Sequence, residues 1–385
     1  MSDAILPFEI QVPDAVLDDL RERLARTRFP DEVNDADWSY GTALAYLKEL
    51  CDYWEKKFDW RKQEATLNRF DQFTTEIDGL RIHFIHQRSK ESSAFPICIT
   101  HGWPGSIVEF TKIIGPLTDP TAHGGRAEDA FHVVCPSMPG YGFSQAASEP
   151  GMDVKRIAEI EAKLMARLGY PRYGTQGGDW GAIISALIGA VDPEHCGGIH
   201  MNMVVAGPPE GADNPVEGVS PKELEGLAAM GRFQEQETGY QRIQGTKPQT
   251  LGYALNDSPA GTAAWIVEKF RTWSDCNGDV ESRFSKDELL TNITIYWATQ
   301  TIASSVRLYC ETLRSGRFGP IGERIEVPTG AAIFPKEIYR PPRKWAEAQY
   351  NLQHWTEMPS GGHFAALEEP AALVEDVRAF FRKVR

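Results

Sequence analysis

The spacing of apolar residues in the N-terminal part of the chain predicts two helices followed by a hairpin. Apolar residues recur at helical spacing over 13–27 and again over about 40–57. Over 74–89 they flank the dipeptide Asp78-Gly79, which is typical of tight β-hairpin turns. We expect residues 1–93 to form an N-terminal segment beside a larger domain.

From residue 94 onward, short apolar runs alternate with helical stretches. Helices are expected over 154–168 and, at the end of the chain, over about 370–384. The expected strands are 95–100, 131–135, 170–176, 326–334 and 352–357. Short buried strands that alternate with helices indicate an α/β fold, with a mostly parallel sheet covered on both faces. In such a sheet, ligands bind at the carboxyl ends of the strands.

Residues 211–318 interrupt this alternation. Helical stretches occur there at 224–236, 262–273 and 287–313, and no strand pattern separates them. We interpret this region as a helical cap that is inserted into one α/β domain. That domain consists of residues 94–210 and 319–385.

Charge and cysteine usage narrow the function classes. A net charge of −14, from 40 basic and 54 acidic residues, argues against nucleic acid and anionic membranes as partners. The six cysteines lie far apart without a C-x-x-C pair, which favours buried thiols in a reducing compartment. The first residues lack a signal-peptide pattern, and no run approaches membrane-spanning length. We therefore expect a cytoplasmic protein without a membrane anchor.

The segment Gly-Gly-Asp-Trp-Gly at 177–181 reads G-x-Asp-x-G where many hydrolases have G-x-Ser-x-G. It stands between an expected strand and an apolar helix start. A tight strand-to-helix turn holds its central side chain at the top of the sheet, and glycines on both sides relieve the crowding. The pattern predicts a nucleophile elbow with Asp179 as the nucleophile. The alternative is an ordinary βα turn in which Asp179 caps the helix.

A nucleophilic carboxylate forms an ester with its substrate, so a base must activate water and an acid must orient that base. His363 lies in a glycine-rich loop between the last expected strand and the last helix, which favours it as the base over a plain polar loop residue. Glu337 directly follows an expected strand and is the candidate acid. Four competing carboxylates lie mid-strand, on a helix or further from a strand end: Glu323, Glu326, Glu347 and Glu357.

Backbone N–H groups after a strand can stabilise the oxyanion of a tetrahedral intermediate. Those of Trp103 and Trp180 are placed to do so. We expect the indole of Trp180 to form a pocket wall, and His101 to be bonded within its own turn. No histidine pair has metal-ligand spacing and no glycine-rich phosphate loop occurs, so we expect no metal and no cofactor.

Several collinear blocks resemble the microsomal-type epoxide hydrolases, which are α/β-hydrolases with an N-terminal wrapping segment and a helical cap. The resemblance runs from about residue 5 to the C-terminus. Its blocks are FDWRKQ at 58–63, HGWPGS at 101–106, GGDWG at 177–181, ALNDSP at 254–259, LLTN at 289–292 and GGHFAALEEP at 361–370.

The resemblance implies an epoxide hydrolase that converts an apolar epoxide and water to a vicinal diol, an activity that serves detoxification. It implies Asp179 as the nucleophile, His363 as the water-activating base and Glu337 as the acid behind it. Two cap tyrosines would protonate the epoxide oxygen: Tyr240, in Glu-Thr-Gly-Tyr, and Tyr309, in Arg-Leu-Tyr.

The substrate pocket is expected to be walled by tryptophans, namely Trp103, Trp180 and Trp297. Homodimerisation is compatible with the family.

Two other functions stay open. An Asp-Trp elbow also occurs in haloalkane dehalogenases, which need no phenol acids because halide leaves without a proton. A non-catalytic ligand-binding homologue on the same fold need not retain all of Asp179, Glu337 and His363.

Overall fold

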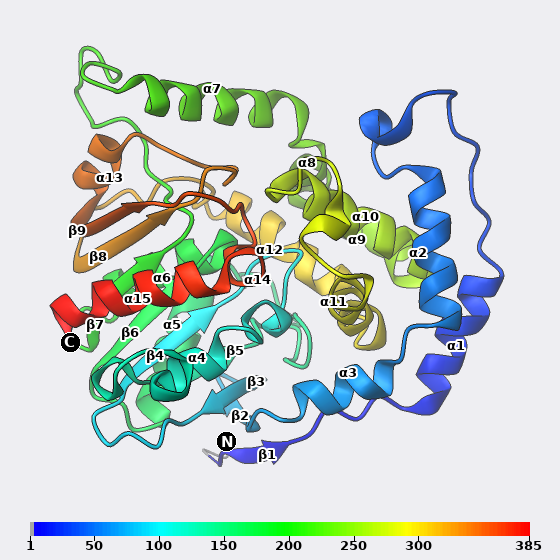
Figure 1. Cartoon of the computed structure of the whole chain (residues 1–385), viewed down its shortest axis with the longest axis horizontal. Coiled ribbons are helices and arrows are strands. Elements are labelled where there is room, and N and C mark those ends of the chain that lie inside the picture. Colours follow the sequence, from blue (N-terminus) through cyan, green and yellow to red (C-terminus); the bar gives the residue numbers. More distant parts are fainter. Residues whose placement is uncertain (1–3) are drawn as a thin grey trace.

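The computed structural model describes residues 4–385 and has one nine-stranded sheet at its centre (Figure 1). The strand order is β1-β2-β3-β5-β4-β6-β7-β8-β9. The pairings that involve β1–β3 are antiparallel, whereas those from β5 through β9 are parallel. The strands are β1 (Leu6–Phe8), β2 (Gln72–Ile77), β3 (Leu80–Gln87), β4 (Phe95–Thr100), β5 (Phe131–Pro136), β6 (Tyr173–Gly177), β7 (Cys196–Met201), β8 (Ile325–Ile333) and β9 (Tyr350–Glu357). The mostly parallel sheet is confirmed.

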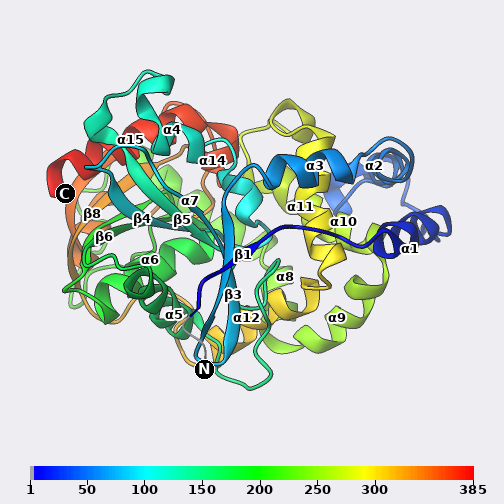
Figure 2. The same ribbon diagram turned by 90° about the horizontal axis from the view of Figure 1, so that it is seen from below.

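Helices cover both faces of this sheet, as the apolar strands require. α5 (Val154–Arg167) and α6 (Asp179–Val191) lie on one face, and α4 (Ile114–Thr118) and α15 (Pro370–Val384) lie on the other (Figure 2). Two short helices, α13 (Arg343–Gln349) and α14 (Ala365–Glu368), flank β9. Both layers bury apolar side chains against the strands, so the carboxyl ends of the strands form a rigid platform.

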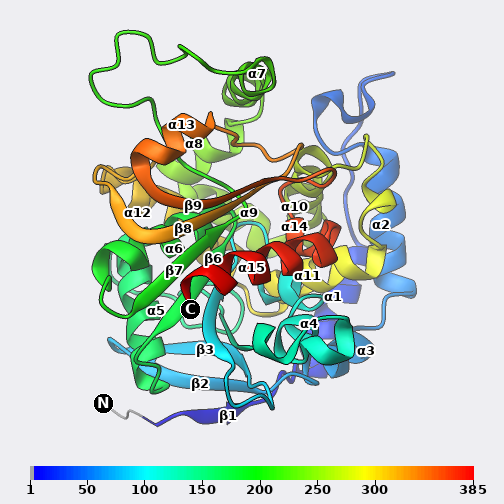
Figure 3. The same cartoon turned by 60° about the vertical axis from the view of Figure 1, so that its left-hand side comes forward.

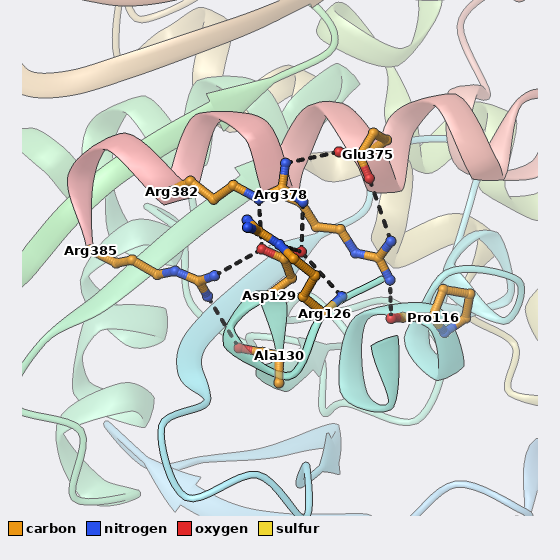
Figure 4. A network of polar contacts seen from close by, with 8 residues as sticks. All are labelled: Pro116, Arg126, Asp129, Ala130, Glu375, Arg378, Arg382 and Arg385. Atoms are coloured by element: carbon orange, nitrogen blue, oxygen red, sulfur yellow. Dashed lines mark hydrogen bonds and ion pairs between the residues drawn. The ribbon is translucent and has the colours of Figure 1, made fainter. Parts of the chain in front are cut away.

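Arginines of α15 fasten this helix to the loop before β5 (Figure 4). The carboxylate of Asp129 is fully buried and accepts two hydrogen bonds of 2.6 Å from Arg382. Arg385 approaches the same carboxylate at 3.3 Å, and Arg378 donates to the carbonyl oxygen of Pro116 at 2.8 Å. Hydrogen bonds from Arg382 lower the pKa of Asp129 to about 2 despite its burial.

The expected cap is a group of helices beyond the carboxyl ends of the strands (Figure 3). Its helices are α7 (Pro221–Gln236), α8 (Gly239–Thr246), α9 (Pro248–Asp257), α10 (Pro259–Trp273), α11 (Lys286–Ala298) and α12 (Ile302–Arg314). The sequence predicted one helical stretch over 287–313, but the chain turns between α11 and α12. Gln300 adopts a left-handed φ of 55° there, which a continuous right-handed helix does not allow.

The N-terminal residues contribute to both parts of the molecule. β1–β3 extend the sheet, and the β2–β3 turn has positive φ at Asp78 (51°) and Gly79 (80°), as a tight hairpin requires. The helices α1 (Asp14–Ala25), α2 (Leu44–Lys56) and α3 (Trp60–Leu67) run along the outside of the cap, against α10 and α11 (Figure 1). Within residues 4–385, no helix has the length and apolar character needed to cross a membrane.

Candidate active site

Asp179 is the first residue of α6, directly after β6, on the tight turn that the sequence predicted. Its φ is +49°, a left-handed conformation that costs about 1 kcal/mol or more in a residue with a Cβ. The turn also brings α6 very close to β4, because a Cβ on Gly181 would overlap the carbonyl oxygen of Thr100. A Cβ on Gly102 would overlap the side chain of Asp179 itself. The glycines therefore allow this carboxylate to stand at the edge of the sheet.

His363 joins two carboxylates that come from different strands. Its Nδ1 lies 2.7 Å from Oε1 of Glu337, which follows β8, and its Nε2 lies 3.3 Å from Oδ2 of Asp179. The backbone N–H of His363 donates to the carbonyl oxygen of Trp273, which fixes the loop against the cap. Burial alone would lower the pKa of His363, but the charges of Glu337 and Asp179 outweigh it and raise that pKa well above its ordinary value. The structure thus brings all three predicted residues together.

The turn after β4 supplies a hydrogen-bond donor to the carboxylate. The backbone N–H of Trp103 donates to Oδ1 of Asp179 at 2.8 Å. His101 is bonded within the turn as expected: its Nδ1 lies 2.9 Å from the carbonyl oxygen of Gly102, and its Nε2 accepts from the N–H of Met138. Burial lowers the pKa of His101 to about 4, so its ring is neutral and structural near pH 7.

The two predicted tyrosines of the cap meet above the elbow. Tyr240 comes from α8 and stacks on the indole of Trp103, with ring centroids 5.4 Å apart. Tyr309 comes from α12 and meets the indole of Trp180 edge-on at 4.7 Å. Both phenols are almost completely buried, at 4% and 2% exposure. Burial raises both pKa values, and the negative charge of Asp179 raises them further, so both hydroxyls stay protonated at neutral pH.

One predicted pocket residue lies elsewhere. The ring of Trp297 faces the guanidinium of Arg23 on α1, 5.6 Å from the ring centroid, and lines a surface groove between α1 and α9. The structure therefore assigns Trp297 to the contact between the N-terminal segment and the cap. Trp297 does not line the site because its position on α11 directs the side chain toward α1 and away from Asp179. The sequence alone does not show which face of a helix contacts the site.

Sequence reasoning missed Trp273, the last residue of α10. Its indole is fully buried, meets the ring of His363 at 5.1 Å and that of Tyr240 at 5.3 Å. The ammonium group of Lys269, one helical turn earlier, lies 4.6 Å from the Tyr240 ring centroid. The only sequence signal was an aromatic residue at the end of an apolar helix, and such residues usually belong to the core.

The six cysteines are all buried free thiols. Within residues 4–385, no cluster of three His, Cys, Asp or Glu side chains has the arrangement of a metal site. The groups that the structure gathers around the elbow include the carboxylate of Asp179, the imidazole of His363 with its acid partner, two phenols and the donor N–H of Trp103. This set suits attack by a carboxylate on an electrophilic carbon, followed by hydrolysis of the resulting ester.

Comparison with known proteins gives a consistent result. Residues 5–110 match the family "Epoxide hydrolase N terminus", and residues 96–301 match the "alpha/beta hydrolase fold" family. Epoxide hydrolase 1 of Sus scrofa is 42% identical, over 98% of this chain and 88% of that protein. The juvenile hormone epoxide hydrolase of the silkworm Bombyx mori superimposes with a TM-score of 0.92 at 34% identity, covering 99% of this chain and 95% of that one. The epoxide hydrolase of Aspergillus niger gives a TM-score of 0.88 at 33% identity, covering 99% and 97%.

Proposed function

This chain belongs to the epoxide hydrolase family and hydrolyses epoxides, and we propose that it does so through a covalent ester on Asp179. One observation carries the proposal. The ring of Tyr240 stacks on Trp103, whose N–H donates to Asp179, and the ring of Tyr309 packs against Trp180, the residue after Asp179. The charge of Asp179 also helps to raise the pKa of both phenols. A nucleophile and two proton donors therefore face the same buried space, which is the arrangement that opening an epoxide ring requires.

The first step breaks a strained C–O bond. Asp179 attacks one ring carbon while Tyr240 and Tyr309 donate hydrogen bonds to the oxygen, which would otherwise leave as a poor alkoxide. One phenol transfers its proton to that oxygen, and the product is a hydroxyalkyl ester of Asp179. The raised pKa of each phenol keeps the proton available at neutral pH.

The second step hydrolyses the ester. Nε2 of His363 takes a proton from water, and the water oxygen attacks the ester carbonyl carbon of Asp179. The backbone N–H groups of Trp103 and Trp180 stabilise the oxyanion. When the intermediate collapses, the C–O bond to the diol breaks and the diol oxygen takes the proton from His363. The new carboxylic acid of Asp179 then loses its proton and the phenolate left by the first step gains one, so the Asp179 carboxylate and both phenols are restored.

Ester formation also prepares the base. In the resting enzyme, Glu337 and Asp179 together raise the pKa of His363. Esterification removes the charge of Asp179, so one of the two causes disappears and the pKa of His363 falls. The imidazole therefore becomes able to accept a proton at the step that needs it.

The walls of the site favour an apolar epoxide. The rings of Trp103, Trp180 and Trp273 enclose the phenols, and each indole is at most 4% exposed. Burying apolar substrate surface against these rings contributes binding energy that a polar epoxide would lack. We further propose a cytoplasmic location, which the six buried free thiols support, and homodimer formation remains a prediction.

Turnover of styrene oxide tests the proposal directly. The enzyme should convert it to the vicinal diol, and the Asp179→Ala variant should form neither ester nor diol although it folds. A panel of haloalkanes run in parallel provides the opposing outcome. Halide release from the wild-type enzyme without diol formation from styrene oxide would refute the epoxide assignment.

A further inference from the structure

A small pocket lies directly beside the catalytic carboxylate and is separate from the phenols. Its volume is about 10 Å³, the size needed to hold a single water molecule. Of residues 4–385, those that line it come from the ends of β4, β6 and β7 with the segments that follow them, and from the His363 loop with α14 and α15; none comes from the cap. It thus places one water-sized space next to both Asp179 and His363.

The carboxyl group of Glu109 forms part of this pocket. Glu109 belongs to a short 3-10 helix, Ile107–Phe110, and its side chain folds back over Gly105. The fit is so close that a Cβ on Gly105 would overlap Oε1 of Glu109. The backbone N–H of Gly102 donates a hydrogen bond to the same carboxyl group. The glycine and the N–H together hold this second carboxyl group at the pocket wall.

A second polar atom of the pocket has no protein partner. Gln176 is almost fully buried, and its Nε2 donates to Oδ1 of Asn202 at 2.8 Å. Among residues 4–385, no donor reaches its Oε1. A buried amide oxygen without a donor costs about 1–3 kcal/mol unless water satisfies it. Gln176 therefore independently indicates that water occupies this pocket.

A water molecule that attacks an ester has two O–H groups to place. One points to Nε2 of His363, which takes the proton, and the other needs an acceptor so that a lone pair faces the carbonyl carbon of Asp179. Acceptors on the pocket wall include Glu109 and Gln176, and the carboxyl group is the stronger of the two once it is ionised. We propose that Glu109 holds the hydrolytic water against His363 and is a positioning residue for ester hydrolysis. This inference rests on the ester mechanism proposed above.

The electrostatics of the pocket suit this role. Burial raises the pKa of Glu109 to about 8, and the charge of Asp179 also raises it. The charge of His363 and the hydrogen bond from the Gly102 N–H act in the opposite direction and lower this pKa. In the resting enzyme Glu109 is therefore mostly neutral, and two carboxylate charges do not compete in one small space. Tyr296 also faces Glu109, and its hydroxyl donates to the carbonyl oxygen of Gly105 at 2.6 Å. Esterification removes the charge of Asp179, so the pKa of Glu109 falls and its oxygens accept a hydrogen bond from water more strongly.

The test separates the two half-reactions under single-turnover conditions with excess enzyme and styrene oxide. Glu109→Leu removes the acceptor at similar size, so we expect ester hydrolysis to slow on the order of 10²-fold. Ester formation should change less than about threefold, so the ester accumulates and intact-mass measurement detects protein heavier by one epoxide. Glu109→Gln keeps one carbonyl acceptor and should recover most of the hydrolysis rate. Gly105→Ala, which displaces the carboxyl group without changing it, should behave like Glu109→Leu.

Glu161→Gln is the matched control. Burial raises the pKa of Glu161 to about 7, but this residue lies on α5 and bonds to Thr100 at 2.6 Å without lining the pocket. It should leave the ratio of the two half-reaction rates unchanged. The inference is overturned if Glu109→Leu hydrolyses the ester at the wild-type rate, or if it slows both half-reactions equally. If the wild-type enzyme forms no ester at all, the mechanism proposed above fails instead.

Discussion

Replacing the cap tyrosines by phenylalanine should slow opening of the epoxide ring and leave hydrolysis of the ester unchanged. Tyr240→Phe and Tyr309→Phe each remove one hydroxyl and keep the ring. The stacking on Trp103 and the edge contact with Trp180 are therefore preserved. The perturbation removes a proton donor from a buried site and leaves a space no larger than the lost hydroxyl group.

The burial of both phenols determines how much the rate of ester formation is expected to fall. A donor aimed at a developing oxyanion in a water-excluded site contributes about 2.7–4 kcal/mol, which is 10²–10³-fold in rate. With 4% and 2% exposure, Tyr240 and Tyr309 meet that condition. Both act on the same oxygen, so the double variant should lose more than about 10³-fold but less than the product of the single effects.

Stopped-flow fluorescence reports ester formation directly, because the indoles of Trp103 and Trp180 contact the phenols and lie beside Asp179. The matched control is Tyr350→Phe. Tyr350 is a buried tyrosine whose hydroxyl donates to the carbonyl oxygen of Val205 at 2.7 Å. It should cost about 1 kcal/mol of stability and leave ester formation unaffected. A double phenylalanine variant that forms the ester within about threefold of the wild-type rate would refute the role given to the phenols.

Three further changes address other parts of the structure. Glu337→Gln should slow ester hydrolysis by up to about 10⁴-fold, as an isosteric change of a base-orienting acid does in other triads, with the ester accumulating in rapid-quench samples; unchanged turnover would contradict the orienting role. Asp129→Asn removes a fully buried carboxylate from its arginines and should lower the free energy of unfolding by about 2–4 kcal/mol at pH 7. The pKa of Asp129 is lowered to about 2, so its stabilisation is complete above about pH 4 and is lost as pH falls toward 2. Urea titrations at several pH values should show a steeper loss of stability in the wild-type enzyme than in Asp129→Asn, which keeps other carboxylates of lowered pKa such as Asp376. Gly181→Ala should prevent stable folding, because its Cβ would overlap the carbonyl oxygen of Thr100. The control Gly231→Ala, in an open helical position of α7, should stabilise the protein by about 0.5–1 kcal/mol in thermal melts. Equal melting temperatures of the two variants would count against the close approach of α6 to β4.

The sequence specified the elbow and its partners because these residues follow local rules. Asp179 lies between glycines on a tight βα turn, and His363 and Glu337 follow strands, so strand order alone brings them to one edge of the sheet. The phenols could be found only through the family resemblance, because nothing in the local pattern of Tyr240 or Tyr309 distinguishes them from packed aromatics.

Elements that depend on tertiary packing escaped prediction. β7 reads Cys-Gly-Gly-Ile-His-Met, and its glycines hide the strand pattern. Gly198 is required there because a Cβ would crowd Val384 of α15 at 2.9 Å, a contact across the fold that no local rule contains. Glu109 and Trp273 were missed for the same reason. Their importance comes from what the fold places next to them, namely a pocket beside Asp179 and the ring of His363.

The covalent ester on Asp179 is the central claim, and a single turnover in ¹⁸O-labelled water tests it most directly. With enzyme in excess over styrene oxide, the first-turnover diol should carry only unlabelled oxygen, and peptide mass analysis should find the label in the carboxylate of Asp179. Label that appears directly in that first diol would mean that water attacks the epoxide ring itself, and the nucleophilic role of Asp179 would be wrong.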